Sequence, residues 1–220
     1  MGVSIEVIRL ALTGIIILVV FYSIIIHELS HAVVSYWLGD DTAKRAGRLS
    51  LNPFKHIDWF GTVILPLIMY FTARVIWGYA KPVPLNPYNY RNMKQGVGLS
   101  ALAGPVSNIL IAIVFAIIYH LGSGGQILPY ISSSVVFFNL LLAFFNLIPI
   151  PPLDGSKVLG MVLSDDAYWR WMAYERAGMY VIFGVLIVSR LMGLNIISRL
   201  ILPPIMLGMN LLGVGLPFTF

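Results

Sequence analysis

Long apolar stretches separated by short polar segments run through the chain from one end to the other. A transmembrane helix needs about 20 predominantly apolar residues. Stretches of roughly this kind are 4–38, 97–121, 131–150, 177–192 and 196–216. The last one contains Pro203 and Pro204, so we expect it to be kinked or broken there. The pattern predicts an all-α polytopic membrane protein with about five transmembrane helices.

A further apolar segment, 60–79, is interrupted by glycine, proline and arginine. The polar loops on either side of it, 39–58 and 80–96, are both rich in Lys and Arg, which favours a cytoplasmic location for both. A full span between them would place them on opposite sides of the membrane. We therefore predict a re-entrant or interfacial segment at about 60–95, with the loop 122–126 on the other side. All but three of the 14 Lys and Arg residues then fall on one side.

Composition supports the membrane class and excludes others. The chain is 59% hydrophobic and only 10% charged, whereas a soluble domain carries about 25% charged residues. Its net charge of +5 comes from Lys and Arg scattered through the loops, so it indicates topology and not a nucleic-acid partner. We expect the first apolar run to be retained, because it is too long for a signal peptide.

Glu28 is the only fully charged side chain between Leu10 and Leu38, and it lies within the sequence HELSH. An ionised group at membrane depth costs about 2.5–3.5 kcal/mol on insertion scales, so it marks a site. On a helix, His27 and His31 share one face and can direct two imidazoles at one metal ion. Glu28 is turned about 100° from His27, within reach of a metal-bound water without being a ligand. This arrangement is typical of a zinc hydrolase, and the absence of Cys leaves His, Asp and Glu as its ligands.

A catalytic zinc needs a third protein ligand and one open position for water. Asp154, in the sequence LDG, is the best candidate, because the prolines before it prevent a regular helix and let the chain turn its carboxylate toward the metal. The same Asp could instead cap a turn, and the spacing leaves both readings open. His56, in a basic loop, and His120, at the far end of a helix, are rival ligands that we expect to be surface or interface residues.

Asn108 and Asn146 carry amide side chains within the apolar stretches near these positions. Asn108 shares a stripe of small residues with Ser100 and Gly104, which permits close approach of another helix. It could serve in helix packing, or it could donate to the substrate backbone or to a developing oxyanion. Asn146 could orient a ligand or cap the end of its helix.

The segments HELSH, AGPVSN and FNLIPIPPLDG, in this order, resemble the motifs of the site-2 protease family of intramembrane zinc metalloproteases. The stretches AKRAGRLSLNPFKHID and GYAKPVPLNPYNYRN are similar to its compact prokaryotic branch, which has no PDZ or CBS domain. The resemblance covers about residues 20–190. It implies one Zn²⁺ ion per chain and assigns the site residues: His27, His31 and Asp154 as zinc ligands, Glu28 as the residue that activates water, and Asn108 as a substrate contact.

The family also implies a single integral membrane protease domain over 1–220, with a metal-binding core at 4–155 and C-terminal helices at 156–220. Such an enzyme hydrolyses peptide bonds of transmembrane or membrane-associated protein substrates, with the lipid bilayer as its other partner and no nucleic acid. We expect a multi-pass protein of the plasma or inner membrane of a prokaryote, with its active site toward the cytoplasm. An edge strand within 60–95 could pair with the unwound substrate.

Two other functions fit an apolar chain with buried His and Asp. One is a metal-ion transporter or channel, which needs several sites along a path, whereas this chain offers one cluster. The other is a catalytically inactive relative that binds substrates, which has no need of Glu28. Both observations favour the protease.

Overall fold

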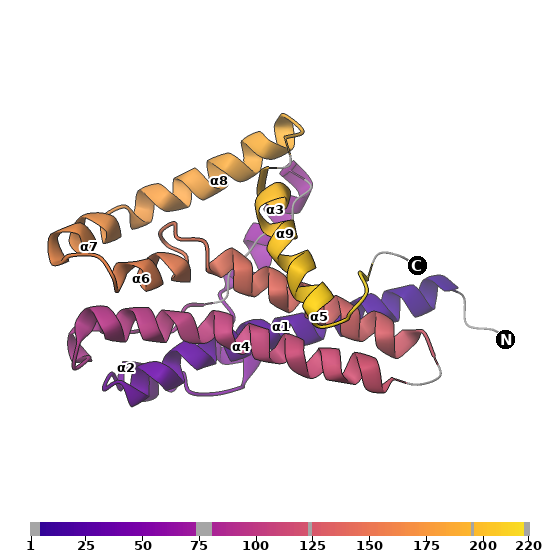
Figure 1. The fold of residues 1–220 in the computed structure, drawn as a ribbon, viewed down its shortest axis with the longest axis horizontal. Helices are drawn as coiled ribbons and strands as arrows, with labels where there is room; N and C mark the ends of the chain where they lie inside the picture. Colours follow the sequence, from indigo (N-terminus) through magenta and orange to yellow (C-terminus); the bar gives the residue numbers. More distant parts are fainter. Residues whose placement is uncertain (1–4, 74–80, 123–124, 195, 218–220) are drawn as a thin grey trace.

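The computed structural model describes residues 5–73, 81–122, 125–194 and 196–217. Every regular element among them is helical, and none of these residues forms a strand. The three longest helices lie side by side (Figure 1): α1 (Ile5–Trp37), α4 (Met93–Leu121) and α5 (Ile127–Asn146). The structure therefore confirms the predicted all-α class.

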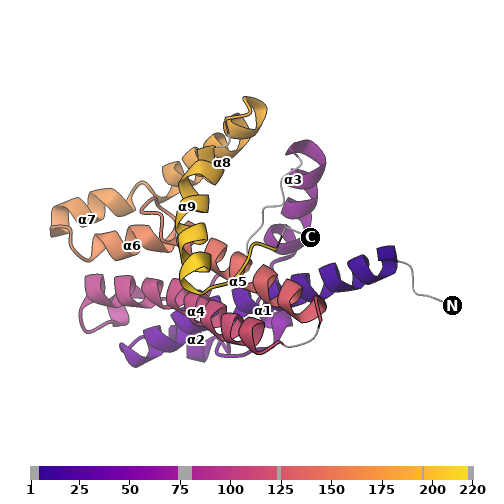
Figure 2. The same cartoon turned by 45° about the vertical axis from the view of Figure 1, so that its right-hand side comes forward.

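These same three helices are long and apolar enough to cross a membrane. The C-terminal part holds four shorter helices: α6 (Asp154–Gly160), α7 (Asp165–Met172), α8 (Glu175–Leu191) and α9 (Ile196–Leu211). Counting the bent pair of α7 and α8 as one span raises the number of candidate spans among the described residues to four. Figures 1 and 2 show α6, α7 and α8 on one side of the three long helices.

The sequence predicts a kink or a break at Pro203 and Pro204; no break occurs, and α9 continues through both residues. Ile201, Ile205 and Met209 on this helix are almost fully buried and pack with residues of α4 and α5 in an apolar cluster. This packing keeps α9 helical although the prolines remove backbone donors from it. The prediction of a break is wrong because tertiary packing was not visible in the local sequence.

In the described part of the segment between α1 and α4, every element is short: α2 (Thr42–Arg45), single turns at Pro53–Lys55 and Pro87–Asn89, a π-helical turn at Trp59–Ile64, and α3 (Leu65–Ala73). The π-helical turn and α3 together are shorter than a membrane span. No strand occurs in the described part of 60–95, so the edge strand predicted there is not found; residues 74–80 lie outside the described residues.

The end of α1 is fixed by a glycine and a buried carboxylate. Gly39 has φ of 112°, its N–H donates to the carbonyl of Tyr36, and the N–H of Asp40 donates to that of Ser35. This is a Schellman ending, in which a glycine commonly closes the helix. The fully buried Asp40 then accepts hydrogen bonds from Thr42, from Ser35 and from the loop 86–89. It thereby ties the end of α1 to the loop that precedes α4.

Candidate metal centre

His27 and His31 lie one turn apart on α1, and both imidazoles face Asp154 at the start of α6. Their Nε2 atoms are 3.2 and 3.3 Å from Oδ2 of Asp154. The three residues are 7–8% exposed, and their ligand atoms lie within 4.8 Å of one another. Among the described residues this is the one group of His and carboxylate side chains that could hold a metal ion.

The orientation of both imidazoles suits metal binding. Nδ1 of His31 lies 2.7 Å from the carbonyl oxygen of Ser100, and Nδ1 of His27 lies 2.6 Å from Oδ1 of Asn108. Each ring thus has an oxygen partner on Nδ1 and turns Nε2 toward the carboxylate. Histidine ligands of zinc commonly form a hydrogen bond to an oxygen through their second ring nitrogen. Two His and one carboxylate are a known ligand set of catalytic zinc sites. The residues present therefore fit a zinc ion.

Gly104 on α4 forms the wall behind the two rings. A Cβ atom at this position would lie 2.5 Å from Cε1 and Nε2 of His31 and 2.6 Å from Cε1 of His27. Only glycine lets α4 approach α1 this closely, because the contacted atoms belong to rings that are already held by hydrogen bonds. The small-residue stripe predicted from the sequence is therefore the surface against which the imidazoles pack.

Asp154 is placed by the turn that joins α5 to α6. Leu153 is extended, with φ of −63° and ψ of 156°, and Asp154 is the first residue of α6, so its carboxylate projects back toward α1. Burial opposes ionisation of this carboxyl, but His31, His27 and Lys157 outweigh that effect and hold its pKa below the ordinary value. An ionised carboxylate is the form that a metal ion requires.

Glu28 lies outside the group of three but next to it on α1. Its Oε2 accepts a hydrogen bond of 3.1 Å from the backbone N–H of Val83. Arg48 holds the preceding residues, because its Nη2 donates to the carbonyls of Lys81 and Pro82. Val83 itself is buried against Ala32 of α1. The non-helical segment 81–83 is thus fastened over the turn of α1 that carries Glu28.

The rival ligands lie elsewhere. His56 bonds the carbonyl of Ser50 through Nε2, and His120 bonds that of Leu212. Neither belongs to the group that could hold a metal ion. The expectation of a surface position is wrong for His56, which is fully buried because the loop folds around its ring and its carbonyl accepts the N–H of Lys81. Asn146 donates to the carbonyl of Leu142 within its own helix.

Asn108 is fully buried, and both ends of its amide are occupied. Besides the contact of Oδ1 with His27, its Nδ2 donates to Oδ1 of Asn139 on α5 at 3.0 Å. Asn139 and Ser23, which bonds it from α1, are buried polar residues that our sequence reasoning did not single out. The available signal was an amide in the middle of the apolar run 131–150.

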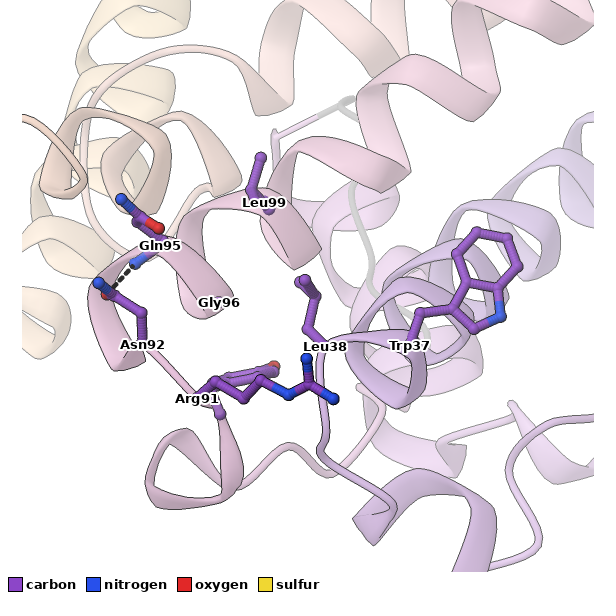
Figure 3. A pocket seen from close by; sticks show the side chains of 8 residues that line it. Trp37, Leu38, Arg91, Asn92, Gln95, Gly96 and Leu99 are labelled. Carbon is purple, nitrogen blue, oxygen red and sulfur yellow. Dashed lines mark hydrogen bonds between the residues drawn. The ribbon is translucent and has the colours of Figure 1, made fainter.

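A separate pocket of about 150 Å³ lies where α1 ends and α4 begins. Figure 3 shows Arg91 extending toward Leu38, and Asn92 accepting a hydrogen bond from the N–H of Gln95. None of the residues that line this pocket is a member of the metal-ligand group. The pocket is therefore distinct from the site described above.

Buried His and Asp side chains between apolar helices, with a carboxylate one residue from the first His, define a membrane protein with a metalloenzyme-like centre. Three relatives agree with this class. YwhC of Bacillus subtilis is 35% identical over 191 residues, covering 83% of this chain and 84% of that protein. MJ0611 of Methanocaldococcus jannaschii is 34% identical over 137 residues, covering 61% and 63%. Rip2 of Mycolicibacterium smegmatis is 24% identical over 192 residues, covering 82% and 70%.

All three relatives are named as candidate zinc metalloproteases. No family model matches the chain, and no solved structure matches it. The identity and coverage with the Bacillus subtilis protein establish the family. The chain belongs to the site-2 protease-like family of zinc metalloproteases.

Proposed function

We propose that this protein is an intramembrane zinc endopeptidase that hydrolyses peptide bonds of transmembrane or membrane-associated proteins. The observation that carries the proposal is the convergence of His27, His31 and Asp154 within 4.8 Å, beside Glu28 on the same helix. The names of the relatives support a zinc-dependent protease. The apolar helices that hold the site support its placement within the membrane.

Nε2 of His27, Nε2 of His31 and a carboxylate oxygen of Asp154 are the proposed ligands of one zinc ion. When bound, zinc polarises a carbonyl oxygen and makes water a better nucleophile at neutral pH. The chain supplies the orientation of the ligands, since Asn108 and Ser100 hold the two rings from behind. Gly104 leaves just enough space for them.

Glu28 is the proposed general base. It takes a proton from the attacking water and passes it to the amine that leaves from the cleaved peptide bond. A carboxylate has about four acceptor positions, so Glu28 can keep its hydrogen bond to Val83 and still accept this proton. That hydrogen bond fixes where the carboxylate points.

Asn108 is proposed as a substrate contact on the strength of the family resemblance. Its amide uses Oδ1 for His27 and one of the two N–H groups of Nδ2 for Asn139, so the second N–H group is the one that would donate to a substrate. The wider setting is likewise a proposal: a multi-pass protein of the plasma membrane, with its site open to the cytoplasmic side and a bilayer-embedded protein as substrate.

The test uses purified protein in proteoliposomes with a transmembrane substrate, comparing wild type with Glu28→Gln. We expect the variant to keep its zinc and to lose at least the 10²–10⁴-fold that general acid–base catalysis typically supplies. Glu28→Asp is the matched control, because it keeps the negative charge but shortens the side chain by one methylene group. Zinc content near one per chain together with ion flux and no proteolysis would favour the transporter, and full activity of Glu28→Gln would remove Glu28 as the base.

A further inference from the structure

Arg48 is the one buried residue among the Lys and Arg whose side chains the structure describes. Its Nη2 donates to the carbonyl oxygens of Lys81 and Pro82. No ion pair in the described part of the chain includes Arg48, and its buried Nε has no hydrogen-bond partner there. Burying a charge without an ionic partner costs free energy, so this position asks for a reason.

The backbone holds Arg48 close to the end of α1. Gly47, with φ of 65°, follows α2, and the N–H of Arg48 then donates to the carbonyl of Ala43 at 2.9 Å. Ala43 is fully buried in an apolar cluster with Ala32 of α1 and Val83. The side chain of Arg48 is therefore fixed at its base before it reaches the loop that precedes α4.

The segment 81–83 connects Arg48 to Glu28. Val83 follows directly after the two carbonyls that Arg48 holds, and its N–H donates to Oε2 of Glu28 at 3.1 Å. The prolines on either side of Val83 limit backbone rotation, because a proline ring fixes its own φ and restricts the residue before it. Once the two carbonyls are held, the N–H of Val83 has little freedom to turn away from Glu28.

The charge of Arg48 also acts on Glu28 through space. Burial lowers the pKa of Arg48, and the negative charge of Glu28 opposes that lowering. The attraction between the two charges favours the same arrangement as the hydrogen bonds do. Arg48 is therefore linked to this carboxylate both through the segment 81–83 and directly through its charge.

We propose that Arg48 is a positioning residue for Glu28. By holding the two carbonyls before Val83, Arg48 keeps the N–H of that residue at the carboxylate. The consequence for catalysis rests on the proposed function, in which Glu28 is the general base. The hold on the segment 81–83 requires neither zinc nor proteolysis, so it is measurable in the metal-free protein. A role of Arg48 in loop stability alone predicts no effect on the turnover of folded, zinc-loaded protein.

Arg48→Met and Arg45→Met form a matched pair of variants. Both remove one guanidinium group and keep a long apolar side chain in its place. Arg45 lies three positions earlier, is exposed and pairs with Asp41, so its loss should not reach the segment 81–83. Arg48→Lys is the conservative variant, because it keeps the charge but offers an ammonium group in place of the planar guanidinium. It should restore part of each effect.

The primary experiment is hydrogen–deuterium exchange of the metal-free protein in detergent, read by mass spectrometry of overlapping peptides. Residues 81–85 contribute only three backbone amide hydrogens, because two of the five are prolines. We expect their exchange to be at least about tenfold faster in Arg48→Met, and unchanged in Arg45→Met. The amides of α5 report any global unfolding. Unchanged exchange of 81–85 in Arg48→Met would overturn the proposal.

A second comparison remains decisive even if Arg48→Met fails to fold. The amide of Val83 should be protected in wild type, and Glu28→Ala should release one slowly exchanging hydrogen within 81–85. Fast exchange of all three amides in wild type, or no release in Glu28→Ala, would show that Val83 is not held at Glu28. Arg48→Lys, with intermediate exchange expected, then takes the place of Arg48→Met.

The second readout is kcat and KM for a transmembrane substrate in proteoliposomes, at equal zinc occupancy. A displacement of about 1 Å in an active site can cost about 10²-fold in rate, so we expect kcat to fall about 10–100-fold in Arg48→Met with KM nearly unchanged. Arg48→Lys should recover part of kcat, and Arg45→Met should match wild type.

Three outcomes would contradict the positioning role: a lowered melting temperature with unchanged kcat, a raised KM alone, or loss of zinc from Arg48→Met. The first would assign Arg48 to loop stability, the second to substrate binding, and the third to the ligands instead of the base. Absence of proteolysis in the zinc-loaded wild type would instead overturn the proposed function. The exchange data would then still decide whether Arg48 holds Val83 at Glu28.

Discussion

Asn139 and Leu140 are neighbours on α5, yet they belong to two regions built on different principles. Leu140 packs with Ala112, Ala116 and Ile205 in an apolar cluster formed by α4, α5 and α9. Asn139 belongs to a polar layer in which α1, α4, α5 and α6 meet around the candidate metal centre. The apolar cluster depends on shape, and the polar layer depends on the direction of each hydrogen bond.

The difference matters because lipid tails are as apolar as leucine. Between helices in a membrane, apolar contacts contribute mainly through close packing, whereas buried polar groups that lose a partner find none in the lipid. We therefore expect changes in the apolar cluster to lower stability and leave the metal centre intact. Changes in the polar layer should affect metal binding first. The following predictions test this division.

Asp154→Ala should have the largest effect. It leaves two ligands, too few for a catalytic zinc, so zinc should be lost as severely as in His31→Ala. Zinc content per chain, measured on purified protein, checks the expectation. Normal zinc content in Asp154→Ala would place the third ligand outside the group of three side chains.

Leu140→Ala tests the other region. Leu140 is 3% exposed, and removing a buried leucine side chain typically costs about 2–5 kcal/mol of stability. The melting temperature should fall while zinc content stays at the wild-type level. A variant that keeps its fold but loses zinc would show that the two regions are coupled through α5.

Asp40→Asn addresses the buried carboxylate at the end of α1. Hydrogen bonds to a charged group are worth about 1.5–3 kcal/mol, and Asp40 accepts several. Burial opposes ionisation of Asp40, but the bonds from Thr42, Asn86 and Asn89 outweigh it and hold its pKa below the ordinary value.

The sign of the pH dependence follows from that lowered pKa. A carboxyl with a lower pKa in the folded state contributes its full stability above the unfolded pKa of about 3.9, and this stability is lost as pH falls through the folded pKa. The difference in melting temperature between wild type and Asp40→Asn should therefore be constant near neutral pH and shrink in acid. A difference that grows in acid would contradict the assignment.

The smallest expected effect is the difference in zinc affinity between Gly104→Ala and Gly208→Ala. The new methyl group at 104 meets two fixed imidazoles at 2.5–2.6 Å, whereas at 208 it meets the flexible end of Leu140 at 3.0 Å. Overpacking of a rigid site typically costs about 1–3 kcal/mol. Zinc affinity should drop in the first variant and remain unchanged in the second. Equal zinc affinity in both would show that the rings can move aside.

How much of the fold and of the site can be predicted from the sequence depends on how far apart in the chain the interacting residues lie. The facing of His27 and His31 follows from helix geometry alone, and the Gly39 ending from backbone conformation. The position of Asp154 needed the family resemblance, because a turn of several prolines does not reveal where it points. Its carboxylate lies 127 residues along the chain from His27 but within hydrogen-bond distance of it in space.

What the sequence did not reveal consists of partners brought together by tertiary packing. Asn139 can be recognised as part of the site only because α4 places Asn108 beside it. Val83 can be recognised only because its N–H donates to Glu28. His56 was expected to be a surface or interface residue because its loop is basic, yet the loop encloses it. Each of these contacts joins residues of different elements, and no local pattern encodes it.

The length of α1 sets the depth at which the enzyme would cut. His27 lies ten positions before Trp37, the residue that ends α1. At about 1.5 Å per residue this is about 15 Å, half of the roughly 30 Å thickness of a bilayer's hydrocarbon core. For the proposed intramembrane protease, with Trp37 at the interface, the severed bond of a substrate would lie near the middle of the bilayer. Each product of the proposed reaction would then keep an apolar segment of about ten residues, half of what a span needs and too short to anchor a protein across a membrane.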